Sequence, residues 1–249
     1  MKRKRHILTL LCAMMTFISA ISVYGATSKY KLYDIDLTVA LPDDLYIVTR
    51  DMAASDPVYK NIDSDALSFT ADMEQKNIYL YALAKNKSYD ISITAVKADK
   101  EKNFDQMTQE ELKANLETEK KEIEDTQKLI VNDMYISEVG DYSYYIYDLE
   151  SADPNEKIYM LRSRMVFRNM SYIITLQTYN GELSDSLRKE FEDLYKSCDY
   201  TKLNASSKTI RMLNEARDLL IGTVLMLAIL GVILIIARIS RNNKKHHAF

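Results

Sequence analysis

The sequence predicts an α+β domain built on one antiparallel β-sheet, followed by a single transmembrane helix near the C-terminus. Apolar and polar side chains alternate in several runs, which is the period of half-buried strands. Two charged segments between these runs carry apolar residues at helical spacing. A later apolar run, from Leu219 to Ala237, contains no charged side chain and has the length of a membrane span.

Strand-like runs come first and recur along the domain. Apolar and polar side chains alternate over residues 33–41, and this run ends at Pro42. A short strand-like run follows at 46–49. Residues 78–83 and 88–95 form a hairpin through the polar turn at 85–87. Three further runs are rich in Tyr, Ile and Val, with a tight turn around Asn169 and Met170 between the last two; they are 142–149, 158–168 and 171–179.

Helices are predicted between these strands. Thr108 and Glu111 have the spacing of a capping box, which opens a charged helix extending to about Lys128. Its narrow apolar seam comprises Leu112, Leu116, Ile123 and Ile130. The closing helix has a cleaner apolar face, comprising Leu183, Leu187, Phe191, Leu194 and Cys198. A shorter helix is expected from Ser64 to about Lys76.

The two ends of the chain predict export and anchoring. Four basic residues precede an apolar run at 7–23, which is typical of a secretory signal peptide over residues 1–25; an uncleaved anchor is the alternative. The exported domain then covers 27–200, and a polar connector covers 201–218. The span at 219–237 precedes a basic tail, 238–249, which places the tail in the cytoplasm of a single-pass cell-membrane protein.

Composition excludes several kinds of chemistry. Between the two ends, 25 Lys and Arg stand against 36 Asp and Glu, a net charge of −11 that argues against nucleic acid as a partner. All three histidines lie outside the domain, so His-dependent catalysis and the usual zinc sites are not expected. No glycine-rich phosphate loop occurs. We therefore expect no enzyme activity and no cofactor, and we interpret pairs such as Asp34 and Asp36 as solvated side chains, not calcium ligands.

Arginines form the first candidate binding group. Arg162, Arg164 and Arg168 are expected on one face of a strand, where they could recognise an anion or a carboxylate together with Arg50. The alternative is that the acidic helix after Thr108 lies across this face and pairs with them, because one face of the sheet must be covered by a helix.

Tyrosines form the second candidate group. Tyr142, Tyr144, Tyr145 and Tyr147 fall within six positions, and alternate residues of a strand point to opposite faces. An exposed cluster would suit contact with a protein or a glycan. The alternative is ordinary β-propensity in a chain without Trp. Cys198 lies on the apolar face of the closing helix and is interpreted as a buried, inert thiol; an intermolecular disulfide or a reactive thiol is the alternative.

A family resemblance follows from the order of elements and two short segments. The first strand ends in Val39-Ala40-Leu41-Pro42, and the closing helix ends in Lys196-Ser197-Cys198-Asp199-Tyr200. In these features residues of about 30–200 resemble the PsbP-like superfamily, which includes DcrB-like lipoproteins. The resemblance implies an antiparallel sheet of six or seven strands flanked by helices, used as a binding or assembly scaffold. Members often carry Gly-Trp soon after the proline, whereas Asp44-Leu45 stands here.

Two functional hypotheses follow. The first is a membrane-anchored, non-catalytic binding or assembly module of the cell envelope, whose partners are the lipid bilayer and an unidentified envelope protein or glycan. The second is a membrane-tethered sensor that passes a ligand or stress signal through the span.

Overall fold

The computed structural model describes residues 27–153, 155–179, 181 and 183–203, together with 209–210, 212–213, 216–217, 219–224, 226–227 and 229. The predicted signal peptide and basic tail, and most of the predicted span, lie outside the described residues. The described positions between 219 and 229 are helical. Among all described residues, no helix is both long and apolar enough to cross a bilayer.

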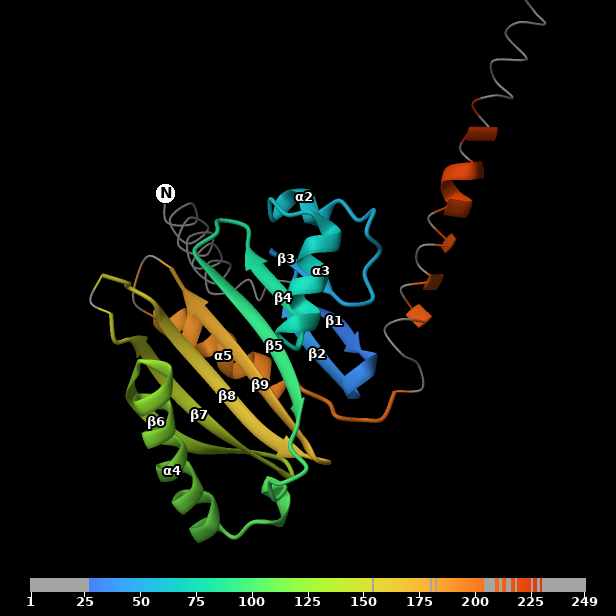
Figure 1. Cartoon of the computed structure of the whole chain (residues 1–249). Helices are drawn as coiled ribbons and strands as arrows, with labels where there is room; N and C mark the ends of the chain where they lie inside the picture. Colours follow the sequence, from blue (N-terminus) through green and yellow to red (C-terminus); the bar gives the residue numbers. More distant parts are fainter. Residues whose placement is uncertain are drawn as a thin grey trace, which may run out of the picture.

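A seven-stranded antiparallel sheet forms the centre of the domain (Figure 1). Its strands lie in the order β3-β4-β5-β9-β8-β7-β6, so β3 and β6 are the edges. The strands in sequence are β3 (Leu45–Thr49), β4 (Ile78–Ala84), β5 (Tyr89–Lys97), β6 (Leu129–Val139), β7 (Tyr142–Ser151), β8 (Tyr159–Phe167) and β9 (Met170–Thr178).

Helices cover both faces of this sheet (Figure 1). On one face, α4 (Gln109–Gln127) lies over the β6 side and α3 (Ala66–Gln75) over the β3 side. The opposite face is covered by α5 (Asp185–Lys196) and by a separate hairpin of β1 (Thr27–Leu32) and β2 (Leu37–Pro42). The remaining short elements are η1 (Tyr33–Ile35), α2 (Val58–Asn61) and η2 (Phe104–Gln106).

The hydrophobic core extends through these layers. Its main cluster joins the central strands to α4, α5 and the β1-β2 hairpin. A smaller cluster holds α2 and α3 against β3, through Val48, Val58, Tyr59 and Met73. The predicted fold class, α+β with an antiparallel sheet flanked by helices, is therefore confirmed.

The first predicted strand is only half correct. Residues 33–35 form the η1 turn, and Asp36 adopts a left-handed conformation with φ of 50°, so the extended strand begins at Leu37. The alternation of Tyr33, Ile35 and Leu37 is compatible with either structure. A local turn took precedence here because it lets the chain reverse direction and β1 pair with β2.

The capping box that opens α4 is confirmed. The Thr108 hydroxyl accepts from the Glu111 amide at 3.2 Å, and the Glu111 carboxylate accepts from the Thr108 amide at 2.7 Å. The predicted apolar seam of this helix extends one residue too far along the sequence, however, because it includes Ile130. Lys128 adopts a left-handed conformation with φ of 53° and ends the helix, so Ile130 lies in β6 and is exposed.

Candidate functional site

Edge strand β6 has a groove on each of its two faces. No described strand pairs with the outer side of β6, because the sheet order ends there. Backbone N–H and C=O groups of alternate residues along an edge strand point away from the sheet and can receive another chain. The side chains of β6 point alternately to the α4 face and the α5 face.

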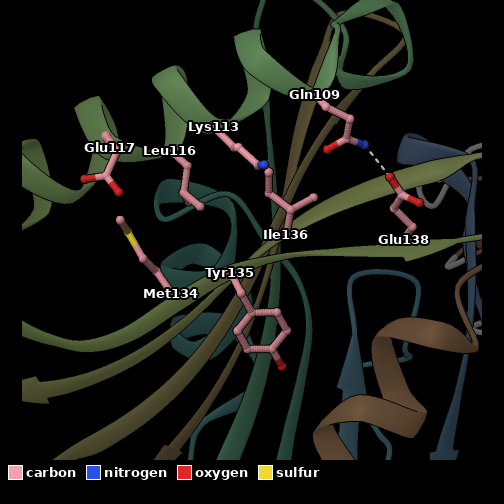
Figure 2. Close-up of a pocket in the computed structure, with 8 residues that line it drawn as sticks. All are labelled: Gln109, Lys113, Leu116, Glu117, Met134, Tyr135, Ile136 and Glu138. Atoms are coloured by element: carbon pink, nitrogen blue, oxygen red, sulfur yellow. Dashed lines mark hydrogen bonds between the residues drawn. The ribbon is translucent and has the colours of Figure 1, made fainter.

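The first groove, which we call the α4 groove, lies between α4 and β6 and has a volume of about 540 Å³. Figure 2 shows Met134 and Ile136 on its strand side and Leu116 on its helix side, while Tyr135 points away from the helix. The polar rim comprises Gln109, Lys113, Glu117 and Glu138, and the Gln109 amide donates to the Glu138 carboxylate. The groove therefore combines an apolar floor with a polar rim.

The second groove, the α5 groove, lies on the other face of β6 and has a volume of about 290 Å³. Its charged lining consists of four acidic and two basic side chains, namely Asp133, Asp148, Asp185, Glu192, Arg188 and Lys189. Both cations are engaged locally, because Arg188 pairs with Asp148 at 2.6 Å and Lys189 pairs with Asp193 at 3.2 Å. The α5 groove is therefore acidic.

A bulge limits the part of β6 that offers a regular edge. The pairing with β7 shifts register between Val131 and Asp133, which leaves Asn132 in a bulge. A bulge bends an edge strand and interrupts regular pairing. Tyr135 follows this bulge, is 49% exposed, and lines both grooves. The regular part of the edge is therefore the segment 133–139.

A buried ion cluster lies between α4 and the sheet. Arg164 pairs with Glu119 of α4 and with Glu101, and the Tyr147 hydroxyl donates to Glu119. The side chains of Arg164 and Glu119 are only 13% and 15% exposed. Burial raises the pKa of Glu119, an effect that the charge of Arg164 opposes. The acidic helix therefore covers Arg164, as the alternative interpretation of this face expected.

Of the other predicted arginines, Arg162 shares the α4 face of β8 with Arg164, whereas Arg168 and Arg50 lie elsewhere. Arg162 donates to Gln127 at the end of α4, and its Nε is buried without a partner among the described residues. Arg168 lies in the turn after β8, where φ of 50° and 60° at Arg168 and Asn169 reverses the chain, so it does not share the strand face. Arg50 lies beyond β3 over the Tyr79 ring, with three strands between β3 and β8.

The predicted tyrosine group does not form an exposed surface, because three of its members are buried and the fourth is partly buried. Tyr144, Tyr145 and Tyr147 are 2%, 0% and 1% exposed. Tyr145 donates to the Leu112 carbonyl at 2.9 Å, whereas Tyr144 points to the opposite face and packs against Tyr195 of α5. Tyr142 is partly buried against Phe167. Large aromatic side chains here fill the core on both faces of β7, where their hydroxyls find partners.

The lone cysteine of the described domain, Cys198, is partly buried. The Cys198 thiol donates to the Leu194 carbonyl at 3.7 Å. Burial raises its pKa to about 12, so little thiolate is present near neutral pH. The raised pKa favours the predicted inert thiol, whereas the predicted burial is only partial.

The sequence reasoning did not identify β6. Its residues, 129–139, include β-branched and aromatic side chains, but Asn132 and Asp133 interrupt the alternation at the bulge. The β-branched run at Ile130-Val131 and the pair Tyr135-Ile136 are the signals that could have found it. Among the described residues, no group of three His, Cys, Asp or Glu side chains could hold a metal ion.

Comparisons with known proteins identify similar structures but no family. No family model matches the chain, and no curated protein matches it. The structure is similar to cyanobacterial PsbP from Synechocystis, with a TM-score of 0.44 and 11% identity over 72% of this chain and 95% of that one. It is also similar to the Saccharomyces cerevisiae Ran-binding protein Mog1p, with a TM-score of 0.44 and 8% identity over 71% and 96% of the two chains.

A third similar structure is a Pseudomonas aeruginosa protein of unknown function, with a TM-score of 0.34 and 13% identity over 70% of this chain and 96% of that one. All these TM-scores are below 0.5, so no argument about partner or activity is drawn from them. The PsbP-like relationship of the domain stays a prediction.

Proposed function

We propose that this chain is a membrane-anchored, non-catalytic binding or assembly module of the cell envelope, with a PsbP-like domain that contacts its partner at edge strand β6. The observation that carries the proposal is the free edge of β6 with a groove on each face. Open, polar-rimmed grooves beside an unpaired strand suit a protein segment better than a small substrate, which usually requires an enclosed pocket.

Membrane anchoring is supported by the apolar run from Leu219 to Ala237 and by exposure in its described part. Leu219, Val224 and Leu227 are among several large apolar side chains there that are more than half exposed. An apolar surface of this kind is costly in water and is stabilised in a bilayer. The basic residues that follow the run favour a cytoplasmic tail.

Alkaline extraction of membranes tests the anchor. The full-length chain should remain in the membrane pellet, because the apolar run is held by the hydrocarbon. A variant with Met226→Lys, Leu227→Lys and Ile229→Lys should be extracted, since each charge near the centre of a span costs about 2.5–3.5 kcal/mol. Extraction of the unaltered chain, or retention of the variant, would contradict the anchor.

Site-specific photo-crosslinking tests the contact surface. A benzoylphenylalanine in place of Tyr135 should give adducts with an envelope component in intact cells. The matched control replaces Leu67, which is also exposed but lies on α3, over the β3 edge of the sheet and away from β6. Adducts at the Tyr135 position that are absent from the Leu67 position support the proposal. Identical patterns at the two positions would contradict it.

A further inference from the structure

The proposed function leaves the chemistry of the partner undefined, and the two grooves beside β6 restrict it. Resting on that function, we infer that β6 receives an extended segment of the partner protein in which aliphatic and basic side chains alternate. The added segment extends the sheet by one strand. Main-chain hydrogen bonds provide affinity in this mode of recognition, and pockets for alternate side chains provide specificity.

The free edge provides the main-chain contacts. Beyond the bulge, 133–139 continues in regular register with β7 as far as Val139. A segment of this length extends over roughly 20 Å, and a strand added to it would lie about 4.8 Å away. The Met134 amide donates to the neighbouring Asp133 side chain at 2.8 Å.

The two grooves receive the side chains of the added strand. Because successive side chains of a strand point to opposite faces, one set would enter the α4 groove and the other the α5 groove. Tyr135 lines both grooves. The site therefore recognises a period of two in the partner sequence.

The chemistry of each groove defines its set of side chains. The floor of the α4 groove comprises Leu116, Met134 and Ile136, so aliphatic side chains are favoured there. In the α5 groove the carboxylates outnumber the cations by four to two; Arg188 pairs with one of these carboxylates, Asp148, and Lys189 pairs with Asp193 outside the lining. Lysine or arginine side chains of the partner are therefore favoured in the α5 groove.

Binding of designed peptides to the full-length chain in detergent tests the inference, with fluorescence anisotropy as the measurement. The probe is a labelled heptapeptide, Lys-Val-Lys-Val-Lys-Val-Lys. The control, Lys-Lys-Val-Val-Val-Lys-Lys, has the same composition and charge without the alternation. The probe should bind at least about tenfold more tightly than the control, because only the probe places valines and lysines on separate faces. Equal affinities would overturn the inference.

Backbone methylation tests strand addition directly. In an extended peptide the valine N–H groups point to one edge and the lysine N–H groups to the other. One probe is N-methylated at all valines and a second at all lysines. One of the two should lose binding by about tenfold or more, and the other should bind nearly as well as the parent. Equal effects on the two probes, or no effect on either, would mean that no strand is added.

Charge variants test the α5 groove. Replacing Asp133→Asn together with Glu192→Gln should weaken probe binding about fivefold to tenfold, since each exposed charge contact contributes modestly. The matched control, Asp72→Asn together with Asp63→Asn, also removes two exposed carboxylate charges, which pair with Lys76 and Lys87. The control should change binding less than twofold. Equal effects would overturn the assignment of the basic side chains.

One result separates this inference from the proposed function, and a second tests another occupant of β6. Crosslinks at Tyr135 without a preference for the alternating probe would keep the binding module and reject the alternating segment. Sedimentation analysis of the full-length chain in detergent addresses a second copy as the occupant of β6. A dimer that dissociates on Tyr135→Lys substitution would show that the edge serves self-association, and would overturn the inference.

Discussion

Removal of the Arg164 guanidinium tests the buried ion cluster between α4 and the sheet. The Arg164→Met substitution keeps an unbranched side chain but leaves the Glu119 carboxylate without its cation. Both partners are mostly buried, at 13% and 15% exposure, so solvent screens the pair weakly. Breaking a buried pair on one side costs about 3–5 kcal/mol. The Tyr147 hydroxyl still donates to Glu119, so we expect a loss near the lower end, about 3 kcal/mol at pH 7.

The loss of stability caused by Arg164→Met should depend on pH in a defined direction. The folded protein binds the Glu119 proton more tightly than the unfolded chain, because burial raises the pKa of this carboxyl in the folded state. Its contribution to stability is therefore largest below the unfolded pKa and falls as the pH rises through the folded pKa. Without Arg164 the pKa rises further. The destabilisation by Arg164→Met should thus be clearly smaller at pH 4 than at pH 7.

Urea unfolding of the full-length chain, followed by far-ultraviolet circular dichroism, measures this loss. A decrease of about 3 kcal/mol corresponds to a fall in Tm of roughly 6–12 °C for a domain of this size. Lys76→Met serves as the control, because its pair with Asp72 is about two-thirds exposed and should change stability little. If Arg164→Met and the control have equal stability at pH 7, the cluster does not hold α4 on the sheet and the reasoning is refuted.

Three further predictions concern single side chains. Tyr147→Phe should lower the free energy of unfolding by about 1.5 kcal/mol, because the buried Glu119 carboxylate loses a hydrogen-bond donor. Urea unfolding measures this decrease, and an unchanged midpoint would contradict the hydrogen bond between Tyr147 and Glu119. Thr108→Ala should cost about 1 kcal/mol through loss of the α4 cap, whereas Thr108→Ser should cost less; equal stability of the two variants would argue against capping. Iodoacetamide should alkylate Cys198 slowly in the folded protein at pH 8 and rapidly in urea, because burial raises the thiol pKa to about 12. Peptide mass spectrometry measures the two rates. Equally rapid alkylation in both conditions would show an accessible thiolate.

Long regular elements could be predicted from the sequence alone. The capping box at Thr108 and the apolar spacing of the closing helix each identified a helix that the structure contains. Alternation also identified β5 and most strands after it. These signals are local, because the period of side chains and the cap geometry are set by neighbouring residues. The acidic face of α4 further suggested the cover over Arg164, which the structure shows.

The features that sequence could not supply depend on contacts between distant residues. Strand β6 is interrupted by a bulge at Asn132, so its alternation is incomplete. The burial of Tyr144 and Tyr145 on opposite faces of β7 depends on α5 and α4 together. The strand order that leaves β6 at an edge is a property of the whole sheet. For this reason the arginine and tyrosine groups were identified as candidates, while the open edge was missed.

Hydrogen–deuterium exchange of the chain in native membranes is the most direct test of the proposed contact at β6. The comparison is with the purified full-length chain in detergent, followed peptide by peptide. Peptides from 133–139 should exchange more slowly in the membrane sample, because the outward amides of β6 gain main-chain partners. Peptides from β3, the other edge of the sheet, should be unchanged. Equal exchange of 133–139 in the two samples would contradict the claim that β6 is the contact surface.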